Sequence, residues 1–374
     1  MLATSSTSAN RGAGCALESR VQDYREPVPR WLLKSPIPTT LLVMVVVATF
    51  SVVGLTRAAN NRVAEVERVE GLSGLLASSV DADGNLIDEN GNVLNDPVDL
   101  PSENYLLVGS DTREGISEDD PDFGVIGNAN AVSGQRADTI MVLRRELDGG
   151  AAIVSLPRDL WVEIPGAGRS NRINAAYNGG AKRLVATVVE TLGIPIHHYV
   201  EVNFVGFRDI VDELGGVTIC FPYPTRDVKA GLDQPAGCNL LDGLQALAFA
   251  RSRTYQEFRE GQWRTDPTAD IGRTQRQQQF ISAAADGAIA RLTDQPFASG
   301  DLITALSASV KVDDTLDPFL TAAALKQAYS GGFSKYSLPV FGDTVGDKSV
   351  LRLGKGSTEI LDYFRGAGPA PAIE

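Results

Sequence analysis

An uncharged segment near the N-terminus constrains this chain more than any other feature. No charged residue occurs between Lys34 and Arg57, and the stretch from Ile37 to Leu55 reads IPTTLLVMVVVATFSVVGL. A helix needs about 20 apolar residues to cross the hydrocarbon core of a bilayer. A cleaved signal peptide usually has a shorter apolar core closer to the N-terminus. We therefore expect an uncleaved transmembrane helix over residues 35–56 rather than a helix buried in a globular core.

This predicted anchor divides the chain into a short tail and a large C-terminal part. Residues 1–34 are polar and unpatterned, so we expect a disordered cytoplasmic tail. Basic residues flank the span on both sides, so the positive-inside rule gives only a slight preference for this orientation. We expect residues 57–103 to be an extracytoplasmic stalk and linker, with a helix over 57–75. Two Gly-Asn turns within 81–96 favour small strands over a calcium loop, because their spacing misses the EF-hand pattern.

Composition excludes several classes of protein. Of the 374 residues, 43% are hydrophobic and 22% are charged, as in ordinary globular proteins, so a fully disordered chain is excluded. The net charge of −13 argues against nucleic acid as a partner, because phosphate backbones are bound by basic surfaces. The two histidines, His197 and His198, are adjacent and neither follows a nucleophile motif. We therefore expect neither a Ser-His-Asp triad nor, in the absence of a Walker pattern, a nucleotide-driven machine.

The C-terminal part alternates between apolar runs and helical patterns, which is typical of an α/β domain with a central sheet. We expect this domain to cover 104–365 and residues 366–374 to be a flexible tail. The expected strands are 104–109, 139–143, 151–156, 199–203, 217–220 and 335–339. The expected helices are 175–193, 204–216, 272–292, 317–329 and 358–364.

Two aspartates stand at the ends of predicted strands. Asp111 follows one buried strand and Asp138 precedes another. Two carboxylates so placed can hold Mg²⁺, whose remaining ligands are then waters or phosphate oxygens. Aspartates are also common at turns without any metal, so spacing alone leaves both readings open.

Arginines and one glutamine are concentrated in the same motifs. Arg251 and Arg253 are two residues apart and would share a face of an extended segment, whereas Arg273 and Gln277 are four apart on one helix face. Arg136 and Arg158 lie at strand ends. Each arginine alone could be a solvated surface residue. Together with two aspartates, the six groups have the composition of a pyrophosphate and Mg²⁺ site.

Seven motifs in a fixed order show a similarity to a known family. The chain resembles the LytR-CpsA-Psr (LCP) family over about residues 104–290. The motifs are NYLLVGSDTR, RADTIMVLRR, AIVSLPRDLWVEIPG, RINAAYNGGA, YVEVNFVGFRDIVDELGGV, LDGLQALAFARSR and DIGRTQRQQ. The resemblance implies an α-β-α sandwich with a central mixed sheet, preceded by one transmembrane helix, and a hydrophobic pocket for a lipid tail.

The resemblance also implies a function and a cofactor. Family members are phosphotransferases outside the membrane that move a glycopolymer from a polyprenyl pyrophosphate carrier onto peptidoglycan. The cofactor would be Mg²⁺, with Mn²⁺ as the alternative ion, and the expected location is the cell membrane, with the catalytic domain outside it.

Site residues follow by motif match. Asp111 and Asp138 correspond to the metal-associated aspartates. The pyrophosphate-binding set comprises Arg136, Arg158, Arg251, Arg253, Arg273 and Gln277. Asp138, Arg158 and Asp159 are the candidate catalytic residues, and the sequence does not choose between Asp138 and Asp159 as the base.

Other functions fit the same residues. Water in place of a sugar acceptor would make the protein a polyprenyl pyrophosphate pyrophosphatase. A non-catalytic lipid-binding regulator or transcription attenuator is a further alternative. Two insertions, 114–133 and 254–269, flank the site and leave the choice of glycopolymer and acceptor open.

The three cysteines are divided by the predicted span. Cys15 precedes it, whereas Cys220 and Cys238 follow it. Outside the cytosol the latter two can form a disulfide, and inside it two free thiols would be expected. We expect the bridge, which would anchor the strand before the loop between the two cysteines to the segment that carries Arg251 and Arg253.

Overall fold

A computed structural model describes residues 66–78, 101–111, 137–147, 149–294 and 309–372, together with residues 85, 87, 92 and 93. These residues belong to the larger of two compact units, residues 57–374. The predicted tail and membrane helix, the insertion at 114–133 and Arg136 lie outside the described residues. Within the described ranges, no helix combines the length and apolar composition that crossing a bilayer requires.

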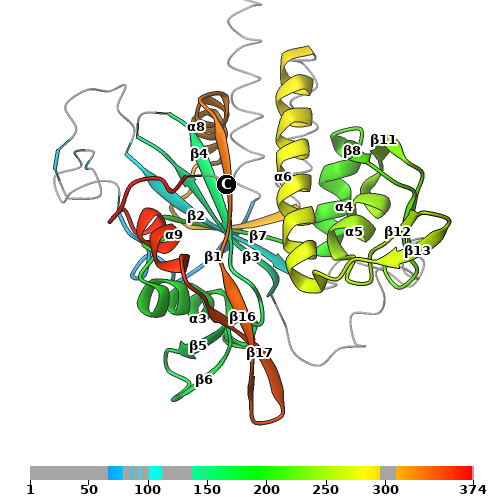
Figure 1. The fold of residues 1–374 in the computed structure, drawn as a ribbon. Helices are drawn as coiled ribbons and strands as arrows, with labels where there is room; N and C mark the ends of the chain where they lie inside the picture. Colours follow the sequence, from blue (N-terminus) through cyan, green and yellow to red (C-terminus); the bar gives the residue numbers. More distant parts are fainter. Residues whose placement is uncertain are drawn as a thin grey trace, which may run out of the picture. The chain divides into compact units, whose positions relative to one another are not determined.

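A seven-stranded sheet forms the centre of the unit (Figure 1). Its order is β1 (Glu67–Val69), β14 (Val310–Asp313), β7 (His198–Val202), β2 (Glu103–Ser110), β3 (Ala137–Arg145), β4 (Ala151–Ser155) and β15 (Phe333–Ser337). The pairs β1/β14, β2/β7 and β4/β15 are parallel and the other neighbours are antiparallel. The central mixed sheet expected from the resemblance is thus confirmed.

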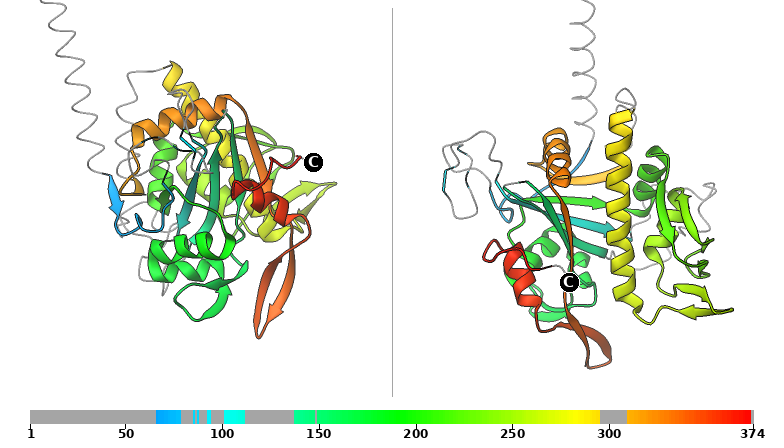
Figure 2. Two further views of the ribbon diagram at one scale, coloured as in Figure 1. Left: turned by 90° about the vertical axis from the view of Figure 1, so that its left-hand side faces the viewer. Right: turned by 45° about the horizontal axis from the view of Figure 1, so that its top comes forward.

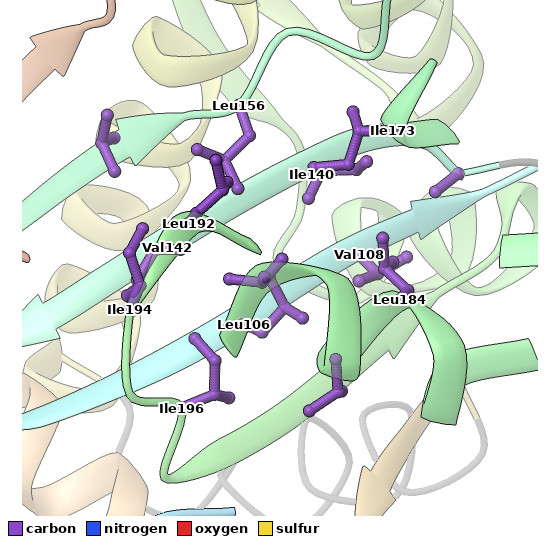
Figure 3. Close-up of a cluster of buried hydrophobic side chains, with 14 of the residues drawn as sticks. Leu106, Val108, Ile140, Val142, Leu156, Ile173, Leu184, Leu192, Ile194 and Ile196 are labelled. Atoms are coloured by element: carbon purple, nitrogen blue, oxygen red, sulfur yellow. The ribbon is translucent and has the colours of Figure 1, made fainter. Parts of the chain in front are cut away.

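Alternating side chains of these strands pack on both faces of the sheet. Leu106 and Val108 of β2 join one buried cluster with residues of η3 (Ile173–Gly179), α3 (Gly180–Ala186), η4 (Thr187–Thr191) and α9 (Ser357–Phe364), as Figure 3 shows in part. Tyr105 and Leu107 point to the opposite face, where Leu325 of α8 (Pro318–Ser330) packs. Helical segments therefore cover the sheet on both sides, as the two views of Figure 2 also show.

A second group of elements lies beside the long helix α6 (Ala269–Asp294) (Figure 1). It comprises α4 (Phe204–Glu213), β8 (Val217–Phe221), β9 (Thr225–Asp227), β10 (Leu232–Gln234), β11 (Gly237–Leu241), α5 (Gly243–Arg251), β12 (Gln256–Arg259) and β13 (Gln262–Thr265). A separate hydrophobic cluster, including Phe249 and Phe280, holds this group together. β8 and β11 are antiparallel, and Cys220 and Cys238 face each other there in a disulfide. β10, β9, β12 and β13 form a small antiparallel sheet in that order.

Two hairpins complete the fold. They are β5 (Trp161–Ile164) with β6 (Arg169–Arg172), and β16 (Val340–Val345) with β17 (Lys348–Leu353). An isolated antiparallel bridge joins Ile87 to Val93, which agrees with the expectation of short strands within 81–96. Most expected strands and helices agree with the structure to within a few residues.

Two expectations about secondary structure are wrong. In the described part of the helix expected over 57–75, residues 67–69 form strand β1, because pairing with β14 and hydrogen bonds from Arg68 to the Asp313 and Leu316 carbonyls outweigh local helical spacing. The single helix expected over 175–193 is divided into a 3₁₀ segment, a short α-helix and a π-helical turn. The flexible tail over 366–374 stays a prediction; within it, the Pro371 carbonyl accepts a hydrogen bond from the Tyr336 hydroxyl.

Candidate functional site

A β-bulge places Asp138 at the centre of the candidate site. Gly109 pairs with Thr139 whereas Ser110 pairs with Ala137, so Asp138 is the extra residue on β3. Bulges redirect side chains and are frequent beside active sites. Asp138 and its neighbour Thr139 accordingly both line one cavity. A Cβ atom on Gly109 would lie 3.0 Å from the Thr139 Cβ, so the close approach of the two strands here requires glycine.

Three arginines surround Asp138. Arg158 Nη1 donates to Asp138 Oδ1 at 2.9 Å, and Arg253 Nη2 lies 3.3 Å from the same oxygen. Arg273 Nη2 donates to the main-chain carbonyl of Asp138 at 3.4 Å. Burial alone would raise the pKa of the Asp138 carboxyl, but Arg253, Arg158 and Arg273 together hold it below its usual value. Asp138 is therefore an anion at neutral pH.

Helix α6 brings Arg273 and Gln277 to the same cavity, as their spacing predicts. Gln277 Nε2 donates to Thr139 Oγ1 at 2.8 Å and to the Ala250 carbonyl at 3.2 Å. Gln278, on the next face of the helix, donates to Ser155 Oγ at 3.0 Å and to the Tyr336 carbonyl at 2.8 Å. These buried hydrogen bonds fix the helix against the central sheet and so fix the two site residues.

Arg251 and Arg253 also line the cavity, although not for the expected reason. The two residues do not share one extended segment, because Arg251 is the last residue of α5 and the helix ends at Ser252. The Arg251 guanidinium lies over the Phe204 ring at 4.4 Å. A capping box between Asp242 and Gln245 fixes the start of this helix, so its last turn is presented at a defined position.

Asp227 is a buried residue that the sequence analysis missed. Its Oδ2 atom accepts hydrogen bonds from Ser252 Oγ and from the main-chain N–H groups of Arg253 and Thr254. Its Oδ1 atom accepts from Thr254 Oγ1 and from two main-chain N–H groups of the following turn. Burial opposes ionisation, but these hydrogen bonds lower its pKa to about 2. Asp227 therefore holds the backbone that carries Arg253, and no spacing rule marks it in the sequence.

Arg276 is a second residue that the sequence analysis did not single out. Its side chain pairs with Asp266 Oδ2 at 2.9 Å, donates to the Ser252 carbonyl at 2.9 Å and lies over the Tyr255 ring at 4.4 Å. It is 7% exposed and joins α6 to the segment after α5. Its position one turn after Arg273 in the DIGRTQRQQ motif is the only signal that could have found it.

The cavity has a volume of about 780 Å³ and lies between the sheet face of Leu107 and Met141 and helices α4, α5 and α6. Part of its apolar lining is deeply buried, as Val211 at 1% and Leu247 at 2% exposure show. The side chains of Arg253 and Asp138 are 44% and 28% exposed. Charge is therefore concentrated at the open end of a cavity whose interior is hydrophobic.

The remaining candidate residues lie beside this opening or outside the described part of the chain. Asp159 lies 3.5 Å from Arg158 and 3.4 Å from Arg172 and does not line the cavity. Asp111 directly follows β2 next to the bulge and is partly buried. The structure therefore brings Asp138, four of the candidate arginines and Gln277 together, with Arg136 outside the described residues.

The donor set at the opening fits a hard cation better than zinc. Among the described residues, no three His, Cys, Asp or Glu side chains gather as a metal site. Zinc sites use three or four such ligands, whereas Mg²⁺ in phosphate sites needs only one or two carboxylates in addition to waters and phosphate oxygens. Asp138, an anion, and Asp111 at the neighbouring strand end have the chemistry for the latter.

Fold and site together define an α/β protein with an apolar cavity whose opening carries arginines and an aspartate. The chain belongs to the LytR_cpsA_psr family, whose sequence profile matches residues 79–360. This match confirms the resemblance seen in the motifs and extends it beyond residue 290.

Relatives of known name support the assignment. The chain is 35% identical to a probable cell wall biosynthesis protein LcpB from Corynebacterium glutamicum, over 63% of this chain and 54% of that protein. It is 37% identical to the polyisoprenyl-teichoic acid–peptidoglycan teichoic acid transferase TagU of Bacillus mycoides, over 49% and 56%. The chain thus spans about half the length of the curated relatives it matches.

A solved structure shows the same fold. The LytR-Csp2A-Psr enzyme from Actinomyces oris superposes with a TM-score of 0.55 at 26% identity, covering 72% of this chain and 91% of that one. The central sheet and its helices are therefore shared with an enzyme of the same family.

Proposed function

We propose that this protein is a membrane-anchored phosphotransferase that transfers a glycopolymer from a polyprenyl pyrophosphate carrier to peptidoglycan. The observation that carries the proposal is a cavity that combines a hydrophobic interior with a charged opening. A polyprenyl pyrophosphate has the same division between an apolar chain and an anionic head. The names of the LcpB and TagU relatives support wall polymers as the substrate class.

The arginines at the opening would bind the pyrophosphate. Guanidinium groups hold phosphate oxygens through paired hydrogen bonds, which a point charge cannot do. Arg253 and Arg273 contact Asp138 and line the cavity, and Arg251 lines it from the end of α5. The polyprenyl chain would lie along the apolar lining, with Phe280 and Leu247 among its contacts.

The reaction is a displacement at phosphorus. A sugar hydroxyl of peptidoglycan attacks the phosphorus nearer the glycopolymer, and a new O–P bond forms. The bond from that phosphorus to the bridging oxygen breaks, polyprenyl phosphate leaves, and the hydroxyl proton passes to solvent. Phosphoryl transfer depends on position and charge neutralisation more than on covalent help, so the arginines supply most of what is needed.

The lowered pKa of Asp138 indicates its role. A general base works best when its pKa is near the working pH, and the pKa of Asp138 is held below the ordinary aspartate value. Asp138 therefore suits a fixed anion that orients Arg158 and Arg253 and, with Asp111, holds Mg²⁺. That ion would neutralise charge on the phosphate oxygens. Asp159 lies beside Arg158 and would orient that guanidinium.

The predicted anchor and the two cysteines support a membrane-attached domain outside the cytosol. A transmembrane helix over 35–56 would keep the cavity near the bilayer from which a polyprenyl carrier comes. The Cys220–Cys238 disulfide favours an extracytoplasmic domain, since disulfides are rare in the cytosol.

Turnover of a labelled donor tests the proposal. The full-length protein in lipid vesicles should convert a polyprenyl pyrophosphate glycopolymer to polyprenyl phosphate in the presence of Mg²⁺ and peptidoglycan, and EDTA should stop it. Polymer appearing in solution, with none on peptidoglycan, would indicate the pyrophosphatase instead. Donor binding without any turnover would indicate a lipid-binding regulator.

A further inference from the structure

The small antiparallel sheet β10-β9-β12-β13 lies beside the site, and one of its faces has no role in the fold or the site as described so far. In β9 and β10, Thr225, Asp227, Leu232 and Gln234 are buried, whereas Arg226 and Asp233 lie between them on the other face. The strand register places further side chains of β12 and β13 on the same face as Arg226 and Asp233. We call this the outer face; its residues are Arg226, Asp233, Gln256, Phe258, Trp263 and Thr265.

The side chains of the outer face hold one another in place. Arg226 Nε donates to Gln256 Oε1 at 2.9 Å, and Gln256 Nε2 donates to Thr265 Oγ1 at 3.1 Å. The Arg226 guanidinium lies over the Trp263 ring at 4.1 Å, and the Phe258 and Trp263 ring centroids are 5.4 Å apart. A row of amide and hydroxyl groups therefore runs beside two aromatic rings, and Phe258 is 39% exposed.

The small sheet lies next to the candidate site. Asp227, at the end of β9, lines the cavity and holds the backbone of Arg253, but it lies on the buried face opposite the outer face. β12 begins three residues after Arg253, with Gln256 on the outer face. At about 3.3 Å per residue for an extended chain, Arg253 and Gln256 are at most about 10 Å apart. A polymer lying on the outer face could therefore reach Arg253 around the edge of the sheet.

We propose that the outer face binds the glycan strand of the peptidoglycan acceptor, an inference that rests on the proposed function. Sugar rings place their C–H faces on aromatic rings, and their hydroxyl and N-acetyl groups form hydrogen bonds with amides and hydroxyls. Few such polar groups suffice to orient a ligand on an apolar surface. The outer face offers both kinds of contact side by side.

The net charge of the outer face indicates which of the two polymers, acceptor or donor, it binds. Arg226 and Asp233 are direct cross-strand partners, so the outer face carries one charge of each sign and no cationic excess. A phosphate-rich polymer would need excess positive charge, as phosphate-binding surfaces do. A strand of N-acetylated sugars needs none. The outer face therefore fits a peptidoglycan strand better than an anionic donor polymer.

Acceptor kinetics test the inference. With saturating donor, soluble uncross-linked peptidoglycan chains are titrated against the full-length protein and its Trp263→Ala and Gln256→Ala variants. We expect the acceptor KM to rise about tenfold in each variant, because central aromatic contacts dominate binding surfaces, while the donor KM stays unchanged. Phe341→Ala is the matched control, because Phe341 is a 53% exposed aromatic residue on β16, outside the small sheet.

Two results would overturn the inference: an unchanged acceptor KM, or a donor KM that rises instead. Thermal unfolding midpoints equal to the wild-type value show that the variants are folded, and Gln256→Ala removes no aromatic packing. Calorimetric binding of the same chains without donor separates this inference from the proposed function. Binding lost in Trp263→Ala supports the outer face even if no transfer occurs, and equal binding rejects it.

Discussion

Asp138 illustrates how the site depends on individual residues. The bulge turns its side chain to the cavity, and three guanidinium groups keep it ionised. Its residue type and motif position could be predicted from the sequence, whereas its redirection by the bulge could not, because a bulge depends on pairing between distant strands. The same holds for Asp227, whose six hydrogen-bond donors come from two separate segments.

Replacing Asp138 tests its role as a fixed anion. Asp138→Asn keeps the shape but removes the charge that Arg158 and Arg253 contact, so we expect transfer to fall by about 100-fold, the effect typical of losing one preorganised electrostatic group. Initial rates at saturating donor measure the loss. Asp347→Asn, on an exposed turn, is the control. Wild-type rates in Asp138→Asn would reject the site assignment.

The planar guanidinium groups of Arg251 and Arg253 lead to a separate prediction. Arg251→Lys and Arg253→Lys keep the charge but lose the planar fork, so kcat/KM for the donor should fall at least about tenfold. Steady-state kinetics with varied donor measure this, and Arg169→Lys on the exposed strand β6 should behave as the wild type. Normal kinetics in both variants would assign Arg251 and Arg253 a purely structural role.

The lowered pKa of Asp227 predicts that the free energy of unfolding depends on pH. In Asp227→Asn the amide NH₂ must face main-chain N–H donors in either orientation, so we expect a loss of roughly 2–3 kcal/mol of unfolding free energy at pH 7. The pKa of Asp227 is lowered from 3.8 to about 2 in the folded state. Its stabilising contribution is therefore complete above about pH 4 and lost as the pH falls towards 2.

Urea unfolding of the wild type and Asp227→Asn at several pH values checks this. The difference between the two proteins should shrink steadily below pH 4. A difference that is absent at pH 7, or that grows on acidification, would contradict the role given to Asp227.

Helices and strands were predicted correctly where a short stretch of sequence carries the pattern that defines them. Helix α6 and strands β2, β3 and β4 carry their periodicity within a few residues. Helix α5 was not predicted, although its capping box lies in the sequence. β1 was missed because three residues become a strand only through pairing with β14, more than two hundred residues later. The site was predicted to the extent that its residues lie in motifs, and the small sheet β10-β9-β12-β13 was not predicted.

The disulfide gives a prediction for the elements it joins. Cys220 and Cys238 are 18 residues apart, and closing a loop of this size stabilises by about 3 kcal/mol in the chain-entropy model. We expect Cys220→Ser/Cys238→Ser to lose up to that amount in urea unfolding, and non-reducing peptide mapping of membrane-extracted protein to find the cross-linked peptides. Free thiols at both positions would contradict the bridge and weaken the external placement of the domain.

For the whole molecule, the central claim is that a single cavity serves one reaction. Its interior is apolar and its opening carries arginines and Asp138, and we propose that these two parts bind an isoprenoid chain and a pyrophosphate. A relative of this chain, TagU of Bacillus mycoides, is named a teichoic acid transferase. The charged opening was predictable from motifs. The hydrophobic pocket was expected only through the family resemblance, because its lining comes from the sheet and three helices that are far apart in the chain.

The most direct test follows the bond that is made. The full-length protein is incubated with donor, Mg²⁺ and peptidoglycan in ¹⁸O-labelled water, and the glycan is then digested and examined by mass spectrometry. We predict muropeptides that carry the glycopolymer through a phosphodiester without ¹⁸O, together with unlabelled polyprenyl phosphate. Free polymer phosphate containing ¹⁸O, with no polymer on any muropeptide, would contradict transfer and assign the same residues to hydrolysis.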